Sequence, residues 1–290
     1  MSRVLLTGAT GYVGGELLPA LLERGHSVRA LTRDPSRARL PDGVEVVAGD
    51  VVGATGLDEA LDGIDVALYL VHSMGAGSQP FADADRRGAR AFAQAATTAG
   101  VRRVVYLGGL QGTSEHLRSR EEVADVLREH GPPLVHARAA MVIGPGSASF
   151  VMMRTLVDRL PVMICPRWID TRSQPIAIAD VVRALADLVE RDDAPPEVEL
   201  GGADVLTYRE MMRRYAAIAG RRVPLIVPVP VLTPHLSSLW VSLVTPVDTG
   251  LARPLIDGLS SEMIVRTPPQ AGINPDPAGF EDAVRAALAG

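Results

Sequence analysis

A glycine-rich turn near the start of the chain is the feature that most restricts its fold. Residues 8–14 read Gly-Ala-Thr-Gly-Tyr-Val-Gly and follow the apolar run 3–7, which is typical of a buried strand. In a strand–turn–helix unit these glycines allow a tight turn, a close backbone approach to a pyrophosphate and close helix–strand packing. The helix N-terminus adds N–H donors and a positive dipole end. We therefore expect a dinucleotide site that includes Gly8, Thr10, Gly11, Tyr12, Val13 and Gly14; the alternative is a turn that has lost its ligand.

Continuously apolar runs alternate with amphipathic stretches through the first half of the chain. The expected strands are 3–7, 27–32, 44–48, 66–70, 103–107 and 134–140, and the expected helices are 13–24, 57–61, 83–99, 119–129, 179–190 and 208–219. This alternation predicts an α/β fold with a Rossmann-type, doubly wound parallel sheet. We expect residues 1–160, with 176–192 returning to them, to form the NAD(P)-binding domain. Residues 161–175 and 193–290 then form a small C-terminal substrate lobe.

The composition excludes several classes of protein and site. A net charge of −5 over 290 residues argues against a basic face for nucleic acid. No apolar stretch approaches the length of a membrane span, and a single cysteine, Cys165, forms no intrachain disulfide, so we expect a cytoplasmic protein. The six histidines show no metal-binding spacing, so no metal site is expected. The oligomeric state stays open.

The end of the second expected strand indicates which dinucleotide is bound. Thr32 stands where an acidic residue would hold the ribose of NAD, and Arg33 and Arg37 follow it. Arginine can pair with a 2′-phosphate, so NADP is favoured over NAD; Asp34, if turned inward, would serve NAD instead. After the third strand, Asp50 and Val51 stand where the adenine edge would lie, although Asp50 also suits a solvated turn.

These motifs together resemble the atypical and extended branches of the short-chain dehydrogenase/reductase superfamily. The closest likeness is to the NmrA-like and complex-I 39-kDa-subunit-like NAD(P)-binding proteins, and it extends from residues 8–14 to 176–182 and 201–204. The resemblance implies a nicotinamide along the ends of the fourth, fifth and sixth strands. Residues expected there are Leu70, Val71, Gly108, Gly109 and Met141.

The chain departs from the superfamily in its proton-transfer residues. Catalytic members use a Tyr-x-x-x-Lys pair with a nearby serine, but this chain contains no lysine, and Gly108-Gly109 fills the serine position. His116 and Arg120 keep the spacing of the missing pair, which suggests a general acid and a ribose clamp. The alternative is a solvated histidine and a helix-start arginine. His72, after the fourth strand, is a second candidate acid.

Three functions fit these observations. The first is an NADPH-dependent oxidoreductase of a hydrophobic carbonyl, enone or quinone-like substrate, with Arg167 and Trp168 at the substrate mouth and the apolar segment 223–247 as a pocket wall. Core packing is the alternative for Trp168, and a membrane-surface or oligomer contact is the alternative for that segment. The second function is a non-catalytic NADP-binding sensor or assembly subunit. The third is an NADP-dependent epimerase, dehydratase or isomerase with histidine acid/base groups.

Overall fold

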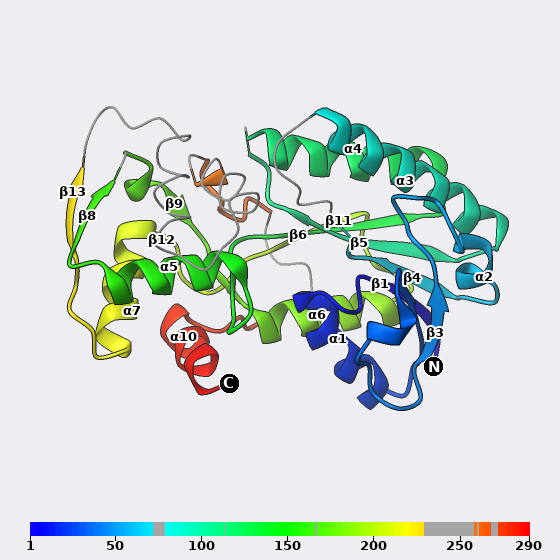
Figure 1. The fold of residues 1–290 in the computed structure, drawn as a ribbon, viewed down its shortest axis with the longest axis horizontal. Helices are drawn as coiled ribbons and strands as arrows, with labels where there is room; N and C mark the ends of the chain where they lie inside the picture. Colours follow the sequence, from blue (N-terminus) through cyan, green and yellow to red (C-terminus); the bar gives the residue numbers. More distant parts are fainter. Residues whose placement is uncertain (72–78, 113, 166, 229–257, 260, 268–271) are drawn as a thin grey trace.

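A seven-stranded parallel sheet forms the centre of the molecule (Figure 1). The computed structural model describes residues 1–71, 79–112, 114–165, 167–228, 258–259, 261–267 and 272–290. His72 and residues 229–247 therefore lie outside the described residues. In the order β11-β6-β5-β4-β1-β2-β3, every neighbouring pair of strands is parallel. The strands are β1 Arg3–Thr7, β2 Ser27–Thr32, β3 Glu45–Ala48, β4 Val66–Tyr69, β5 Arg103–Gly109, β6 Leu134–Ala139 and β11 Glu197–Leu200.

Helices cover both faces of this sheet, which confirms the doubly wound α/β fold. Helices α1 (Tyr12–Glu23) and α6 (Ile178–Glu190) pack on one face, where Leu17, Val181 and Leu185 are fully buried. Helices α2 (Leu57–Leu61), α3 (Gln79–Thr98) and α4 (Glu115–His130) lie on the other face. The strands are thus buried on both sides, which is why they read as continuous apolar runs.

The strand order reverses direction between β1 and β4. From β1 the chain builds β2 and β3 toward one edge, and from β4 it builds β5, β6 and β11 toward the other. Thr7 links the two halves, since its hydroxyl donates to the Leu68 carbonyl at 3.0 Å and accepts from the Leu70 N–H at 3.0 Å. Such a reversal leaves a crevice beyond the carboxyl ends of the strands, where ligands bind in this class of fold.

A second hydrophobic core lies beside the sheet, at the left of Figure 1. It is formed by α5 (Ala148–Arg159), α7 (Tyr208–Ile218) and α10 (Phe280–Ala289), with the fully buried rings of Phe150, Tyr215 and Phe280. The short elements are β7 Val142–Ile143, β8 Val162–Cys165, β9 Arg172–Ser173, β10 Ile176–Ala177, β12 Leu206–Thr207, β13 Leu225–Pro228, and the 3-10 turns η1 Pro35–Arg37 and η2 Arg167–Asp170.

Some elements differ from the sequence-based expectation. Helix α4 begins at Glu115 instead of residue 119, because Ser114 caps it by accepting the Leu117 N–H at 3.3 Å. Strand β11 pairs with β6 in the main sheet, and α5 packs in the second core. We therefore propose that β11 belongs to the cofactor domain and α5 to the lobe. None of the helices in the described part of the chain has the length and apolar character needed to cross a bilayer.

Candidate functional site

The glycine loop connects β1 to α1 in a conformation that depends on its glycines. Gly8 has a φ of +74°, a left-handed value that disfavours other residues, and its carbonyl accepts the Gly11 N–H at 2.9 Å. A Cβ atom on Gly14 would lie 2.2 Å from the Gly8 carbonyl oxygen. The first helical turn therefore packs directly on the loop, as the sequence motif predicted.

The start of α1 offers donors to a phosphate group. The first helical hydrogen bond of this turn joins the Gly15 N–H to the Gly11 carbonyl at 2.8 Å, so the N–H groups of residues 12–14 precede it and have no partner within the helix. No acidic side chain occupies the first turn, and Gly11 caps the helix without a side chain. These residues fit a pyrophosphate, which is stabilised by free N–H groups and the positive end of the helix dipole.

A cavity of about 490 Å³ connects this loop with the ends of the central strands and with the lobe. Its volume is within the usual range for a small-molecule site. The expected site residues among its lining are Gly8, Gly11, Tyr12, Val13, Gly14, Leu70, Gly108, Gly109, His116, Arg120 and Met141. Its wall on the lobe side includes Tyr208, Leu259 and Met263. Thr10, Arg33, Arg37, Asp50, Val51, Val71 and Trp168 are not part of this lining.

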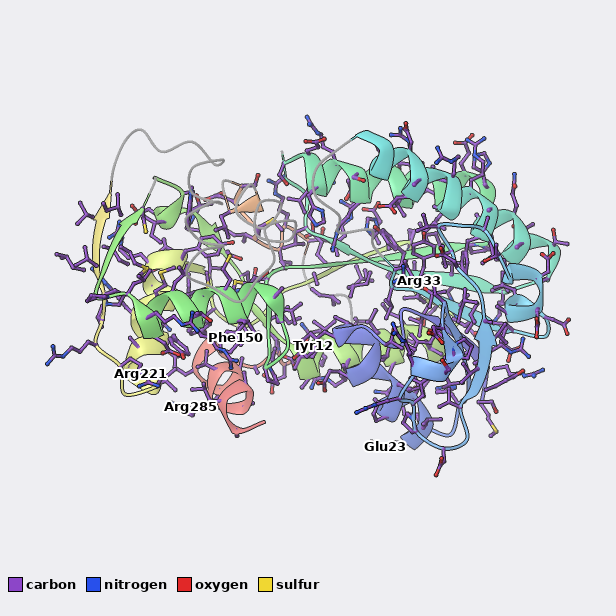
Figure 2. All side chains as sticks on the ribbon, in the orientation of Figure 1. Tyr12, Glu23, Arg33, Phe150, Arg221 and Arg285 are labelled. Carbon is purple, nitrogen blue, oxygen red and sulfur yellow. The ribbon has the colours of Figure 1, made fainter. Side chains whose placement is uncertain are left out.

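Tyr12 lies between the glycine loop and the lobe (Figure 2). Its ring packs against the turn after β7, since a Cβ on Gly144 would lie 1.9 Å from its hydroxyl oxygen and one on Gly146 would lie 2.5 Å from its Cδ2. Burial, followed by the charge of Glu16, raises the pKa of Tyr12 to about 12. Tyr12 therefore stays protonated at neutral pH and acts as part of the cavity wall.

At the end of β2, the arginines and the acid have different surroundings. The Asp34 carboxylate accepts the Ser36 N–H at 3.1 Å and lies 3.5 Å from Arg37, so it caps η1. Arg33 is exposed and forms no ion pair with any carboxylate of the described residues. The free cation at this position is therefore Arg33, and the acid is already held by its own turn.

The turn after β3 is closed by Asp50. Its carboxylate accepts the Val52 N–H at 3.1 Å, and its backbone pairs with Thr55 across the turn. Val51 is almost fully buried. Asp50 thus has a local structural role, with its carboxylate engaged within the turn.

His116 and Arg120 lie one turn apart on α4 and both line the cavity. Because the helix starts at Glu115, their spacing places them on one helical face. Burial, with the Arg120 charge as a second cause, lowers the pKa of His116 to about 4. Burial also lowers the pKa of Arg120, against the opposing charges of Tyr106 and Asp85. At neutral pH His116 is therefore a neutral imidazole beside the Arg120 guanidinium. This imidazole can donate a hydrogen bond through its N–H, but it does not act as an imidazolium acid.

His136 is a residue of this region that the sequence reasoning missed. It lies fully buried on β6, with its ring centroid 5.0 Å from that of Tyr106, and neither ring nitrogen has a hydrogen-bond partner among the described residues. A Cβ on Gly108 would lie 2.3 Å from its Nε2, and one on Gly109 would lie 4.0 Å from Arg120 Nη1. His136 thus fills the space that a side chain at position 108 would need. Only the β5–β6 register could have revealed this, and the sequence carries no signal for it.

Trp168 lines a narrow apolar branch beside the main cavity. Its ring meets that of Tyr208 edge to face, with centroids 6.3 Å apart. Arg167 begins η2, but its side chain lies outside the described atoms. Residues 223–247 were expected to form a pocket wall. In their described part, 223–228, Val223, Leu225 and Val227 are exposed, and none of these six residues lines the main cavity or its apolar branch.

The remaining candidate groups are structural. Cys165 is buried, and burial raises its pKa to about 11, so it is a thiol in the core of the lobe. Among the described residues no three His, Cys, Asp or Glu side chains come together as metal ligands. In the described structure, the candidate functional residues therefore lie on the glycine loop, at the carboxyl ends of the strands and on α4.

Comparison with known proteins agrees with this geometry. A family model described as NAD(P)H-binding matches residues 8–140. Ceramide reductase of Caulobacter vibrioides is 32% identical over 264 residues, which cover 86% of this chain and 82% of that protein. A (4-alkanoyl-5-oxo-2,5-dihydrofuran-3-yl)methyl phosphate reductase of Streptomyces griseus is 31% identical over 75% of this chain and 74% of its own length. The NADPH complex of an Escherichia coli NADPH-dependent quinone oxidoreductase has the same fold, with a TM-score of 0.79, 18% identity and coverage of 98% and 99%.

Proposed function

The chain belongs to the NAD(P)H-binding family, and from this premise we propose that it is an NADPH-dependent reductase, of the atypical short-chain dehydrogenase/reductase type, that acts on a small hydrophobic carbonyl, enone or quinone-like compound. The observation that carries the proposal is the cavity that joins the glycine loop to the apolar lobe, with His116 and Arg120 on its wall. Two relatives that match three quarters or more of this chain are named reductases, one of a ceramide and one of a (4-alkanoyl-5-oxo-2,5-dihydrofuran-3-yl)methyl phosphate.

Bound NADPH would supply a hydride at the strand ends. The residues of the chain would hold the pyrophosphate at the glycine loop and the substrate against the apolar wall of the lobe. A carbonyl oxygen that gains negative charge is stabilised by preorganised donors, and we assign this role to the neutral His116 N–H and the Arg120 guanidinium, which both line the cavity. A neutral histidine acting in this way matches a known pattern, in which the imidazole polarises a carbonyl without being an acid. The proton that completes the alcohol or hydroquinone then comes from water.

Arg33 supports the preference for NADP. It is a free cation beside the expected ribose, while Asp34 is held by Ser36 and Arg37. Replacing Arg33 with alanine should weaken NADPH binding by about 10- to 150-fold, the range of one charge-assisted hydrogen bond, and leave NADH binding nearly unchanged. Isothermal titration with both cofactors measures this, and Arg37→Ala is the matched control. Equal losses for NADPH and NADH would disprove a phosphate contact.

The reductase activity is tested by following the absorbance of NADPH with a panel of quinones, enones and ketones. We expect turnover, with His116→Ala and Arg120→Ala each lowering kcat by about 100- to 1000-fold, as for the loss of one donor to a developing oxyanion. Unchanged kcat in both variants would remove these residues from the mechanism.

A second candidate is a non-catalytic NADP-binding sensor. The observation that favours it is the absence of lysine together with a neutral His116, which leaves no strong acid on the described wall of the cavity. Tight NADPH binding without turnover on any compound of the panel would support this alternative.

A further inference from the structure

A narrow apolar branch leaves the main cavity between α5 and α7. Met141, Ser149, Tyr208 and Leu259 line both spaces, so the branch opens from the side of the cavity that faces the lobe. Beyond this shared wall the branch is formed by the two helices: Met152, Met153 and Leu156 come from α5, Met212 from α7, and Trp168 covers it.

From this arrangement we propose that the branch receives an unbranched alkyl group carried by the substrate beside its reducible carbonyl. The proposal rests on the reductase function above and narrows its substrate class to carbonyl or quinone compounds with a linear alkyl substituent. The reacting end would lie at His116 and Arg120, and the alkyl group would extend between α5 and α7.

The chemistry of the lining favours a thin hydrocarbon. The open volume is about 20 Å³, room for about one methyl or methylene group, so a longer chain enters only if the lining side chains move, and a ring or a branched group would need a larger movement. Four of the lining residues are methionines (Met141, Met152, Met153 and Met212), whose unbranched, polarizable side chains adapt to the shape of a guest. A chain that enters can therefore widen the branch by rotamer changes of these residues.

Water is a poor occupant of this space. A buried water needs two to four polar partners, whereas the surface that the described lining turns into the branch is almost entirely apolar, and only Ser149, Tyr208 and Trp168 carry polar side-chain atoms there. Hydrocarbon in the branch would instead gain the full transfer energy of leaving water.

The test is a homologous series of 2-alkyl-1,4-naphthoquinones, from methyl to octyl, titrated calorimetrically into the full chain saturated with NADP⁺, so that no turnover occurs. Affinity should rise about fourfold for each added methylene over the first few carbons and then level off where the branch ends. An affinity that is flat across the series, or that rises without a limit as expected for an open surface, would overturn the proposal.

Variants of Met212 locate the end of the branch. Met212→Ala should move the plateau to longer chains, and Met212→Phe should remove the chain-length dependence while methyl naphthoquinone still binds. Met211→Ala is the matched control, because Met211 is fully buried on the same helix but lines neither space. If Met211→Ala shifts the plateau as much as Met212→Ala, the branch is not the binding site.

The same ligands separate this proposal from the reductase function. If NADPH is not consumed with any member of the series but the plateau and its response to Met212 are present, the reductase function fails and the alkyl site stands. If turnover occurs at equal KM for all chain lengths, the function stands and the alkyl site fails.

Discussion

Replacing Gly108 with serine would restore a side chain at the position where reductases of the resembled superfamily carry one. The structure predicts a large cost for this change. The new Cβ would lie 2.3 Å from Nε2 of His136, well inside any normal contact distance. The ring has little room to move away, because it is fully buried and packs against Tyr106. Overpacking of this kind costs about 1–3 kcal/mol of the free energy of unfolding.

Urea unfolding of the Gly108→Ser, His136→Ala and double variants measures this cost as a double-mutant cycle. Removing the ring should relieve the clash, so the double variant should be more stable than the sum of the single effects by about 1–3 kcal/mol. Gly109→Ser is the matched control: its Cβ would lie 2.8 Å from a terminal methyl of Leu117, which can rotate away. A Gly108→Ser variant within about 0.5 kcal/mol of the native chain, or a strictly additive cycle, would refute the reasoning.

Three further outcomes follow from the structure. Gly14→Ala should abolish NADPH binding in a titration, because its Cβ would lie 2.2 Å from the Gly8 carbonyl and displace the first turn of α1; binding within a factor of two of the native chain would contradict the tight loop packing. Burial, with the charges of nearby arginines as further causes, lowers the pKa of His136 to about 3, so the unfolded chain binds a proton below pH 6.5 that the folded chain does not. On acidification from about pH 6 to 5, His136 should therefore lower the free energy of unfolding by about 1.4 kcal/mol per pH unit. In urea titrations, His136→Gln should remove this contribution to the dependence of the unfolding free energy on pH. An unchanged pH dependence in the variant would show that His136 does not cause it. Arg120→Gln should raise the pKa of His116 above about 4 in an NMR titration, since the Arg120 charge lowers it; a lower pKa in the variant would contradict that cause.

The parts of the fold that the sequence predicted are those set by local physics. The central strands were recognisable because strands buried on both faces are continuously apolar, and the glycine loop because Gly8 and Gly14 satisfy steric needs within one turn. The apolar-run pattern did not predict strand β11, because its four residues, Glu197–Leu200, alternate in polarity, as is typical of an edge strand.

The candidate site depended more on contacts between distant residues. The i, i+4 pairing of His116 and Arg120 was visible, but the low pKa of His116 comes from burial that only the packed fold reveals. His136 lies 28 positions from Gly108 and meets it through the pairing of β5 and β6. The narrow apolar branch likewise requires α5 and α7 to be adjacent, and no local sequence pattern specifies that adjacency.

The path of the chain between its two cores limits how such a protein can evolve. After β6 the chain enters the second core with α5, returns to the sheet with α6 and β11, and re-enters the second core with α7; helix α10 packs in that core as well. No single cut therefore separates the lobe from the sheet, so the lobe cannot be exchanged as one continuous segment of the chain. New substrate preferences in a chain of this topology are therefore expected from substitutions within the lobe, made while three crossings of the chain keep it joined to the sheet.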